Sequence, residues 1–254
     1  MSTLLERIAA SQPVQLVLAI VVYAVYAVVL GLCFTPPLAV ALWAWQTWLP
    51  LGAPVEVGRV LLVGLSLGAA YFVFLMASTV IMGSLVRLLT LGFKPGKYPK
   101  ASLTTVRWLI ASGITTMAYR LVLPLIPVSW FSNMFFLLTG CRMGKNCYLN
   151  AFMLNDAYLL ELGDNVTIGG GAEISCHLWE QDHLILDRIV IGSGTLIGAN
   201  CYIAPGVSIG RNCVIGLGSY VRRGTKVPDG SRLTRVGAVS LRKAAELERE
   251  RVRP

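Results

Sequence analysis

The stretch IGSGTLIGANCYIAPGVSIGRNCVIG, residues 191–216, repeats with a period of six. An aliphatic residue recurs at every sixth position from here on, at Ile191, Ile197, Ile203, Ile209, Ile215, Val221, Val227 and Leu233. Glycine or alanine follows the first five of these sites, and compact residues occupy most positions two before them. An α-helix with 3.6 residues per turn does not generate this period, and the strand period of two alone does not either.

A period of six is typical of a triangular coil of short parallel strands, in which three repeats make one turn. The aliphatic residue points into a narrow prism, and the small residues let the chain bend at the corners. The same phase is visible upstream at Met143, Leu149, Leu162, Ile168 and Ile174. The pattern therefore predicts a left-handed parallel β-helix of roughly four coils, which we assign to residues 141–240.

The repeat is interrupted between Ile174 and Ile191, which are 17 residues apart. About ten residues, 175–184, must leave the coil there, and both histidines of the chain lie among them. Loops on rigid scaffolds carry function disproportionately. We expect His177 to act as a general base, with Glu180 as the carboxylate that orients it; Asp182 is also within range by sequence. A zinc site is the alternative, but two histidines are too few for a three-histidine centre, so we expect no metal.

Composition divides the chain in two. Only 14% of the residues are charged and 55% are apolar, whereas soluble domains carry about 25% charged residues. Residues 1–140 hold 8 Lys/Arg and 2 Asp/Glu, against 14 and 11 in residues 141–254. This excludes a disordered chain and argues against a protein that is wholly soluble or wholly embedded in a membrane. The net charge of +9 forms no basic stripe with interleaved aromatics, so we expect no nucleic acid partner.

The apolar part, residues 1–100, is predicted to be a transmembrane helical hairpin. Residues 14–34 and 60–86 carry no charge, and about 20 apolar residues suffice to cross a bilayer. We expect Pro36 and Pro37 to end the first span and the tryptophan-rich residues 38–49 to lie at the interface.

Basic residues set the expected orientation. Four of them lie between Arg87 and Lys100, and none lies in residues 35–58. Both ends of the hairpin are then cytoplasmic, which places the protein in the cytoplasmic membrane as a multi-pass protein with its β-helix in the cytoplasm. Residues 101–140 are predicted to be an interfacial helical connector, with a third span from Leu109 as the alternative that would put the β-helix outside. Residues 241–254 are expected to form a charged helix or tail.

The coil, the loop histidine and the run of glycines over residues 191–200 resemble the hexapeptide-repeat acyltransferases. Three segments carry a closer resemblance to the membrane-anchored terminal modules of poly-ε-lysine-synthetase-type non-ribosomal peptide synthetases. They are Gly92-Phe-Lys-Pro-Gly-Lys-Tyr-Pro99, Asp156-Ala-Tyr-Leu-Leu-Glu-Leu-Gly-Asp164 and Ile174-Ser-Cys-His-Leu-Trp-Glu180. Two departures stand out: Cys176 replaces the threonine that precedes the family histidine, and residues 235–241 lack the proline of the family's last turn.

The resemblance implies an enzyme in which His177 is catalytic, a homotrimer, and an acyl-CoA donor lying between adjacent coils. Within this chain we expect the donor, most simply acetyl-CoA, along the coil near residues 203–221. Backbone amides at small corners are candidates for the oxyanion, and basic residues at the last corners are candidates for the donor's phosphates. The expected donor-binding residues are Gly198, Ala204, Gly216, Arg222, Arg223 and Lys226.

The sequence thus predicts a membrane-anchored acyltransferase that moves an acyl group from a thioester to a hydroxyl or amine. An acceptor that is itself associated with the membrane would suit an enzyme anchored there. Two alternatives stay open. One is amide-bond formation with a carrier-bound aminoacyl thioester, and the other is a non-enzymatic trimeric membrane scaffold.

Overall fold

The computed structural model describes residues 12–50, 54, 56–151 and 153–233. The chain divides into two compact units, residues 1–85 and residues 86–254. Each unit is described by itself below. The expected tail at 241–254 and the loosely matching turn at 235–241 lie outside the described residues.

The first unit contains helix α2 (Gln12–Trp48) and most of helix α3 (Val57–Thr90). The expectation that Pro36 and Pro37 end the first helix is wrong, because both lie inside α2, which runs on to Trp48. Prolines inside long apolar helices are tolerated where local groups satisfy the freed backbone. Residues 38–48 therefore belong to the same helix as the predicted first span, and Leu49 follows the end of that helix.

Within the residues that the structure describes, three helical segments are long and apolar enough to cross a membrane, judged by length and composition alone. They are Ala19–Trp48, Val57–Thr90 and Leu103–Leu125. The second contains the predicted span 60–86 and extends it at both ends. The third begins at Leu103, before Leu109, and belongs to the second unit.

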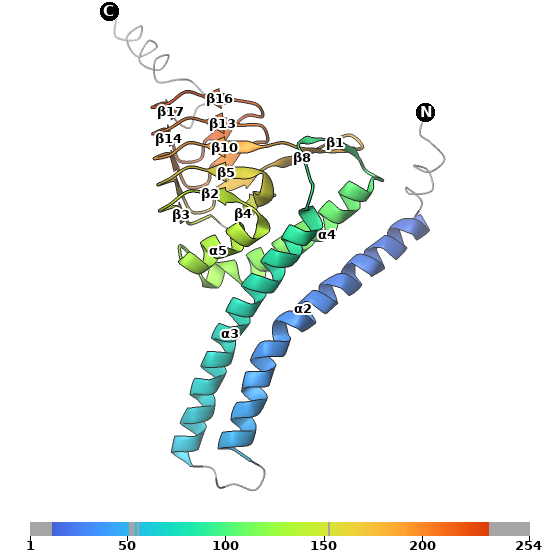
Figure 1. The fold of residues 1–254 in the computed structure, drawn as a ribbon, viewed down its shortest axis with the longest axis vertical. Coiled ribbons are helices and arrows are strands. Elements are labelled where there is room, and N and C mark those ends of the chain that lie inside the picture. The colour runs from blue at the N-terminus through green and yellow to red at the C-terminus, as the bar shows by residue number, and fades with distance from the viewer. Residues whose placement is uncertain (1–11, 51–53, 55, 152, 234–254) are drawn as a thin grey trace, which may run out of the picture. The chain divides into compact units, whose positions relative to one another are not determined.

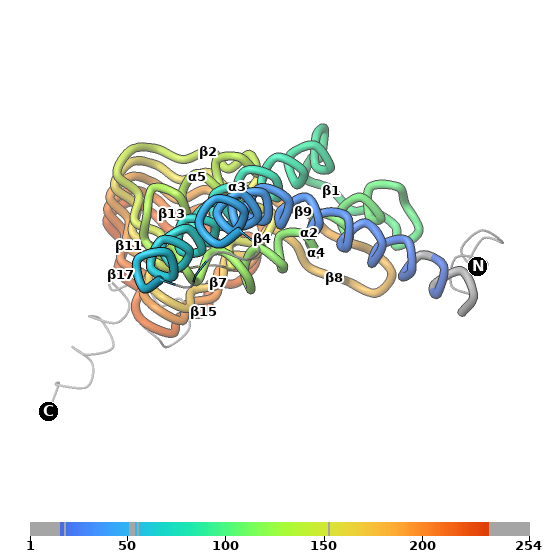
Figure 2. Tube along the Cα trace, turned by 90° about the horizontal axis from the view of Figure 1, so that it is seen from below, coloured from blue at the N-terminus to red at the C-terminus, as the bar shows by residue number. Residues whose placement is uncertain are grey.

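The second unit is built on a coil of short parallel strands, which confirms the β-helix prediction (Figures 1 and 2). Face 1 contains β2 (Arg142–Met143), β5 (Leu160–Leu162), β10 (Ile189–Ile191), β13 (Ser208–Ile209) and β16 (Lys226–Val227). Face 2 contains β3 (Tyr148–Leu149), β6 (Thr167–Ile168), β11 (Leu196–Ile197), β14 (Val214–Ile215) and β17 (Arg232–Leu233). Face 3 contains β4 (Met153–Asn155), β7 (Glu173–Ser175), β12 (Tyr202–Ile203) and β15 (Tyr220–Val221).

The aliphatic residue of each repeat fills the prism, as the period of six requires. Ile191 stands beside Ile209, and Ile203 beside Val221, each pair 18 residues apart in the sequence. The inward side chains from Ile168 to Val221 are at most 1% exposed. The coil thus stacks one hydrophobic layer on the next, which is the source of stability in solenoids.

The repeat has a second irregularity, between Leu149 and Leu162. Leu154 takes an inward position only five residues after Leu149, and the next inward site is Leu162. The extra chain forms a short 3₁₀ turn, η2 (Ala157–Leu159). Asp156 precedes this turn with a positive φ of 57°, a conformation that aspartate tolerates better than most residues. This irregularity places Asp156 at the candidate site described below.

The predicted excursion from the coil is an ordered β-hairpin rather than an irregular loop. Strands β8 (His177–Glu180) and β9 (His183–Leu186) pair antiparallel, and β1 (Gly96–Pro99) pairs antiparallel with β9. The resulting three-stranded sheet projects from the coil (Figure 1). A further hydrogen bond, from the Lys100 amide to the Asp182 carbonyl at 2.8 Å, continues the pairing of β1. The segment after α3 therefore braces the hairpin that carries both histidines.

Two helices cover the coil end that holds β2, β3 and β4 (Figure 1). They are α4 (Leu103–Leu121) and α5 (Trp130–Thr139), joined through the 3₁₀ turn η1 (Leu123–Leu125). Ser102 caps α4 by accepting a hydrogen bond from the Thr105 amide, and Ser129 forms a capping box at the start of α5. Phe135 and Phe136 of α5 are at most 1% exposed, so α5 buries its aromatic side.

Candidate active site

The site centres on His177, the first residue of the hairpin, and Asp156, which precedes η2. His177 Nδ1 lies 2.5 Å from Asp156 Oδ2. Because an ionised carboxylate only accepts hydrogen bonds, the proton between them belongs to Nδ1. The neutral imidazole then has its lone pair on Nε2, and no residue in the described part of the chain donates to that nitrogen. Nε2 is therefore free to take a proton from a substrate.

Asp156 is a buried carboxylate held by three donors. Its side chain is 5% exposed. Oδ1 accepts from the Trp108 indole Nε1 at 2.7 Å and from the Tyr158 hydroxyl at 3.1 Å, while Oδ2 faces His177. These three donors satisfy a charge that would otherwise be costly to bury. They also fix the carboxylate, and hence the imidazole, in one orientation.

The electrostatics favour a basic histidine. Burial alone lowers the pKa of His177, but the hydrogen bond and negative charge of Asp156, together with the charge of Glu173, outweigh it and raise the pKa. A raised pKa makes the imidazole a stronger proton acceptor. The side chain of His177 remains 22% exposed, so an acceptor molecule can reach it.

Aromatic side chains form one wall of the site. The ring of Trp108 lies edge-on to His177 with 4.8 Å between centroids, and Trp179 lies edge-on to Trp108 at 5.8 Å. Trp108 is 6% exposed, whereas Trp179 is 43% exposed. The buried ring positions His177 and Asp156, and the exposed ring offers a surface to whatever binds beside them.

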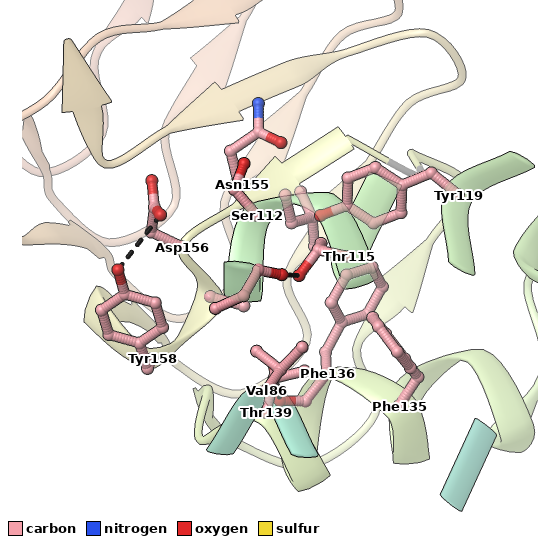
Figure 3. A pocket seen from close by; sticks show the side chains of 13 residues that line it. Val86, Ser112, Thr115, Tyr119, Phe135, Phe136, Thr139, Asn155, Asp156 and Tyr158 are labelled. Carbon is pink, nitrogen blue, oxygen red and sulfur yellow. Dashed lines mark hydrogen bonds between the residues drawn. The ribbon is translucent and has the colours of Figure 1, made fainter. Parts of the chain in front are cut away.

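Beside Asp156 lies a small cavity of about 10 Å³, room for about one water molecule. Ser112, Thr115 and Tyr119 of α4 line it together with Phe135 and Phe136 of α5 (Figure 3). This cavity is too small for a substrate. The candidate substrate side is the one that carries the exposed ring of Trp179.

Glu180 does not orient His177, contrary to our expectation. Its carboxylate pairs with Arg223 at 2.7 Å, and both side chains are nearly half exposed. Glu180 stands at the far end of β8 and pairs in register with His183. Because alternate residues of a strand point the same way, Glu180 lies on the opposite face of β8 from His177. The carboxylate that contacts His177 in the structure is that of Asp156.

The expected donor residues occupy two corners of the coil. Gly198 and Gly216 follow β11 and β14, whereas Ala204 and Arg222 follow β12 and β15, at the corner from which the hairpin leaves the coil. The amides of Gly198, Ala204 and Gly216 donate to Ile215, Val221 and Leu233 at 2.7, 3.0 and 2.6 Å. These amides are committed to the ladder, so the structure does not favour them as oxyanion donors.

The basic residues at the hairpin corner and at the start of β16 differ in availability. Arg222 and Lys226 are exposed and form no ion pair within the described residues, whereas Arg223 already pairs with Glu180. Arg223, Glu180 and Lys97 line an open groove of about 340 Å³ beside β1 and β9. Arg222 and Lys226 therefore remain the better candidates for an anionic part of a donor.

Cys176 directly precedes His177 but is unsuited to nucleophilic catalysis. It is buried, and burial raises the pKa of its thiol well above the ordinary value, as do the nearby charges of Asp156 and Asp187. Among the residues that the structure describes, no three His, Cys, Asp or Glu side chains gather into a metal-binding group.

Sequence reasoning missed Asp156, Trp108 and Tyr158 as site residues. Asp156 precedes His177 by 21 residues and Trp108 precedes Asp156 by 48, so proximity in sequence does not link them. The spacing of the inward residues did indicate where an extra residue enters the coil. The inward positions Leu149 and Leu162 are 13 residues apart rather than 12, which marks an insertion where Asp156 lies.

Comparison with known proteins agrees with this architecture. The family described as Bacterial transferase hexapeptide (six repeats) matches residues 188–223. A curated relative, the Delta-poly-L-ornithine synthetase of Acinetobacter baumannii (strain AB307-0294), is 27% identical over 129 residues. That match covers 51% of this chain but only 10% of the relative, so the chain spans a small part of its length.

Solved structures with the same repeat show limited similarity. A hexapeptide-repeat acetyltransferase from Vibrio cholerae O1 biovar eltor, solved with acetyl coenzyme A, is 20% identical over 56% of this chain and 89% of its own, with a TM-score of 0.42. A galactoside acetyltransferase in complex with coenzyme A is 18% identical over 55% of this chain and 82% of its own, with a TM-score of 0.41. These partial matches agree with the hexapeptide repeat that the second unit shows.

Proposed function

We propose that the protein is a membrane-anchored acyltransferase in which His177 is the general base and Asp156 its positioning residue. One observation carries this proposal. Asp156 holds Nδ1 of His177 at 2.5 Å and leaves Nε2 without a partner among the described residues. A fixed tautomer with a raised pKa is the arrangement that a general base requires.

The reaction follows from that geometry. The acceptor's O–H or N–H loses its proton to Nε2 as the oxygen or nitrogen bonds to the thioester carbonyl carbon. The tetrahedral intermediate then collapses, the C–S bond breaks, and the imidazolium returns the proton to the leaving thiolate. Asp156 stabilises the positive charge on His177 between these steps. The products are the acylated acceptor and a free thiol.

The donor is an acyl-CoA, most simply acetyl-CoA, as the family resemblance implies. Arg222 and Lys226 are exposed at and just after the corner from which the hairpin leaves the coil, which supports a role in holding the donor's phosphates. A homotrimer with the donor between adjacent coils is part of the same proposal.

The membrane anchor is formed by α2 and α3, and α4 lies along the soluble domain rather than across the bilayer. Two features of α4 support this assignment. Trp108 of α4 donates to Asp156, and Ile114 and Ala118 are at most 1% exposed. A helix that forms a wall of the site cannot also face lipid on all sides. An even number of spans keeps the β-helix on the side of the basic residues that follow α3, which we assign to the cytoplasm.

Amide-bond formation with a carrier-bound aminoacyl thioester is the second candidate. The 27% identical match to a poly-ornithine synthetase favours it, because a peptide synthetase joins aminoacyl units. The same His177–Asp156 pair would serve, with an amine as acceptor. A trimeric scaffold without activity is the third candidate. The contact between His177 and Asp156, which leaves Nε2 without a partner among the described residues, argues against it.

The proposal is tested with purified detergent-solubilised protein, labelled acetyl-CoA and a native membrane fraction as the source of acceptor. We expect label to move to the membrane fraction and free thiol to appear in equal amount. A parallel incubation with an aminoacyl carrier protein in place of acetyl-CoA separates the second candidate. Failure of both donors would reject both enzymatic functions.

A further inference from the structure

Face 3 of the coil presents an outward row of side chains beside the base. Glu173 pairs in register with Tyr202, and Tyr202 with Tyr220. Their neighbours Ile174 and Ile203 are fully buried in the prism, so Glu173 and the two tyrosines point outward. Glu173 stands on β7, the strand that leads directly into His177.

The carboxylate of Glu173 is only partly used. Its Oε1 accepts a long hydrogen bond of 3.3 Å from Asn155 Nδ2. No lysine or arginine in the described part of the chain forms an ion pair with it. Its negative charge reaches both neighbours, because it contributes to raising the pKa of His177 and the pKa of Tyr202. A carboxylate without a cation therefore lies within electrostatic range of the base.

Aromatic surface adjoins this carboxylate. The rings of Tyr202 and Tyr220 stack with 5.3 Å between centroids and an angle of 11° between planes. Tyr220 is 55% exposed, and Trp179 beyond His177 is 43% exposed. A carboxylate next to aromatic faces is the chemistry that recognises an ammonium group, through a charge-assisted hydrogen bond and cation–π attraction.

We propose that Glu173 and Tyr202 form a subsite for an ammonium group on the acceptor, separate from the atom that is acylated. The two groups must be distinct, because a carboxylate bound to the nucleophilic nitrogen would keep that nitrogen protonated and unreactive. The acceptor is thus a molecule with a hydroxyl or amine at His177 and a second, cationic amino group at Glu173. This inference rests on the proposed acyl transfer and specifies its substrate class.

Two matched pairs of small acceptors test the subsite with acetyl-CoA as donor. The first pair is 1,4-diaminobutane and 1-aminobutane, and the second is 4-amino-1-butanol and 1-butanol. Within each pair the nucleophile is the same and only the ammonium group differs. We expect KM to be about ten- to a hundredfold lower for the member with the ammonium group, the range of a charge-assisted hydrogen bond.

Glu173→Gln should remove that preference in KM, because glutamine retains the shape but not the charge. Glu161→Gln is the matched control, since Glu161 lies on face 1 and pairs with Arg142 and Arg188. Glu161→Gln should leave the preference unchanged.

Three results would overturn the subsite. The first is equal KM within both pairs, and the second is an ammonium preference that survives Glu173→Gln. The third is no transfer to any of the four acceptors while label still enters the native membrane fraction, which would leave the proposed acyl transfer intact. If the membrane fraction is not labelled either, the proposed function itself fails.

Discussion

Asp156→Asn separates the geometry of the site from its chemistry. Oδ1 of Asp156 accepts from Trp108 at 2.7 Å and from Tyr158 at 3.1 Å, so an asparagine at this position must place its amide oxygen there. Its NH₂ group then faces Nδ1 of His177 and donates to it. The ring proton is forced onto Nε2, where it blocks the base. The substitution thus installs the wrong tautomer without removing a side chain.

The magnitudes follow from this exchange. General-base catalysis contributes about 10²- to 10⁴-fold, so kcat should fall by that factor, or about 3–5 kcal/mol of barrier. Stability should fall by only about 1–2 kcal/mol, because two hydrogen bonds persist and one charge-assisted bond becomes neutral. Asp156→Ala should be less stable than Asp156→Asn, since it leaves buried donors on Trp108 and Tyr158 unpaired. Label transfer from acetyl-CoA and thermal unfolding in detergent measure the two effects. An Asp156→Asn enzyme with kcat within threefold of the parent would refute the assignment of Asp156.

The remaining predictions concern the same pair and its surroundings. Trp108→Phe should keep the ring edge beside His177 but remove one donor to Asp156, which costs about 1.5–3 kcal/mol of stability by thermal unfolding and about tenfold in kcat. Glu180→Gln should change kcat by less than about threefold and stability by at most about 1 kcal/mol, because its pair with Arg223 is exposed. A loss of about a hundredfold in kcat would show that Glu180 takes part in catalysis. The raised pKa of His177 predicts that kcat/KM rises with pH through a value above about 6.5; an acid limb below pH 6 would contradict it. The pKa of His177 is raised in the folded state, so the stability added by the His177–Asp156 pair is fully present below about pH 6.5. That stability is lost as pH rises through the folded pKa. The difference in Tm between the parent and Asp156→Asn should therefore be larger at pH 6 than at pH 9.

The coil could be predicted from the sequence because its determinant is local and repeated. Each repeat independently requires one inward aliphatic residue, and the eight regular sites from Ile191 to Leu233 leave little freedom in register. His177 could be predicted for a related reason. A residue outside a strict period is conspicuous, and its chemistry then suggests a role.

The partners of His177 could not be predicted in the same way, because they come from separate elements. Trp108 lies on α4, Asp156 precedes η2, and His177 begins the hairpin. Sequence proximity favoured Glu180, but the strand alternation of β8 turns Glu180 to the other face. The helix through Pro36 and Pro37 was missed for a different reason. The helix-breaking rule for proline applies to isolated helices in water, and a long apolar segment tolerates both residues.

The ordered hairpin also depends on a contact that no local pattern reveals. Strand β1 comes from the segment just after α3, about 90 residues before β9, and its Gly96–Pro99 backbone pairs with His183–Leu186. This pairing joins the segment after α3 to the hairpin that carries His177.

The central claim is that Nε2 of His177 takes the acceptor's proton during transfer from an acyl thioester. Its most direct test is the rate of label transfer from acetyl-CoA to a native membrane fraction by the parent protein and by His177→Ala, with equal folding verified by thermal unfolding. We expect transfer by the parent and a loss of about 10²- to 10⁴-fold in the variant. Transfer by His177→Ala at the parental rate would contradict the claim.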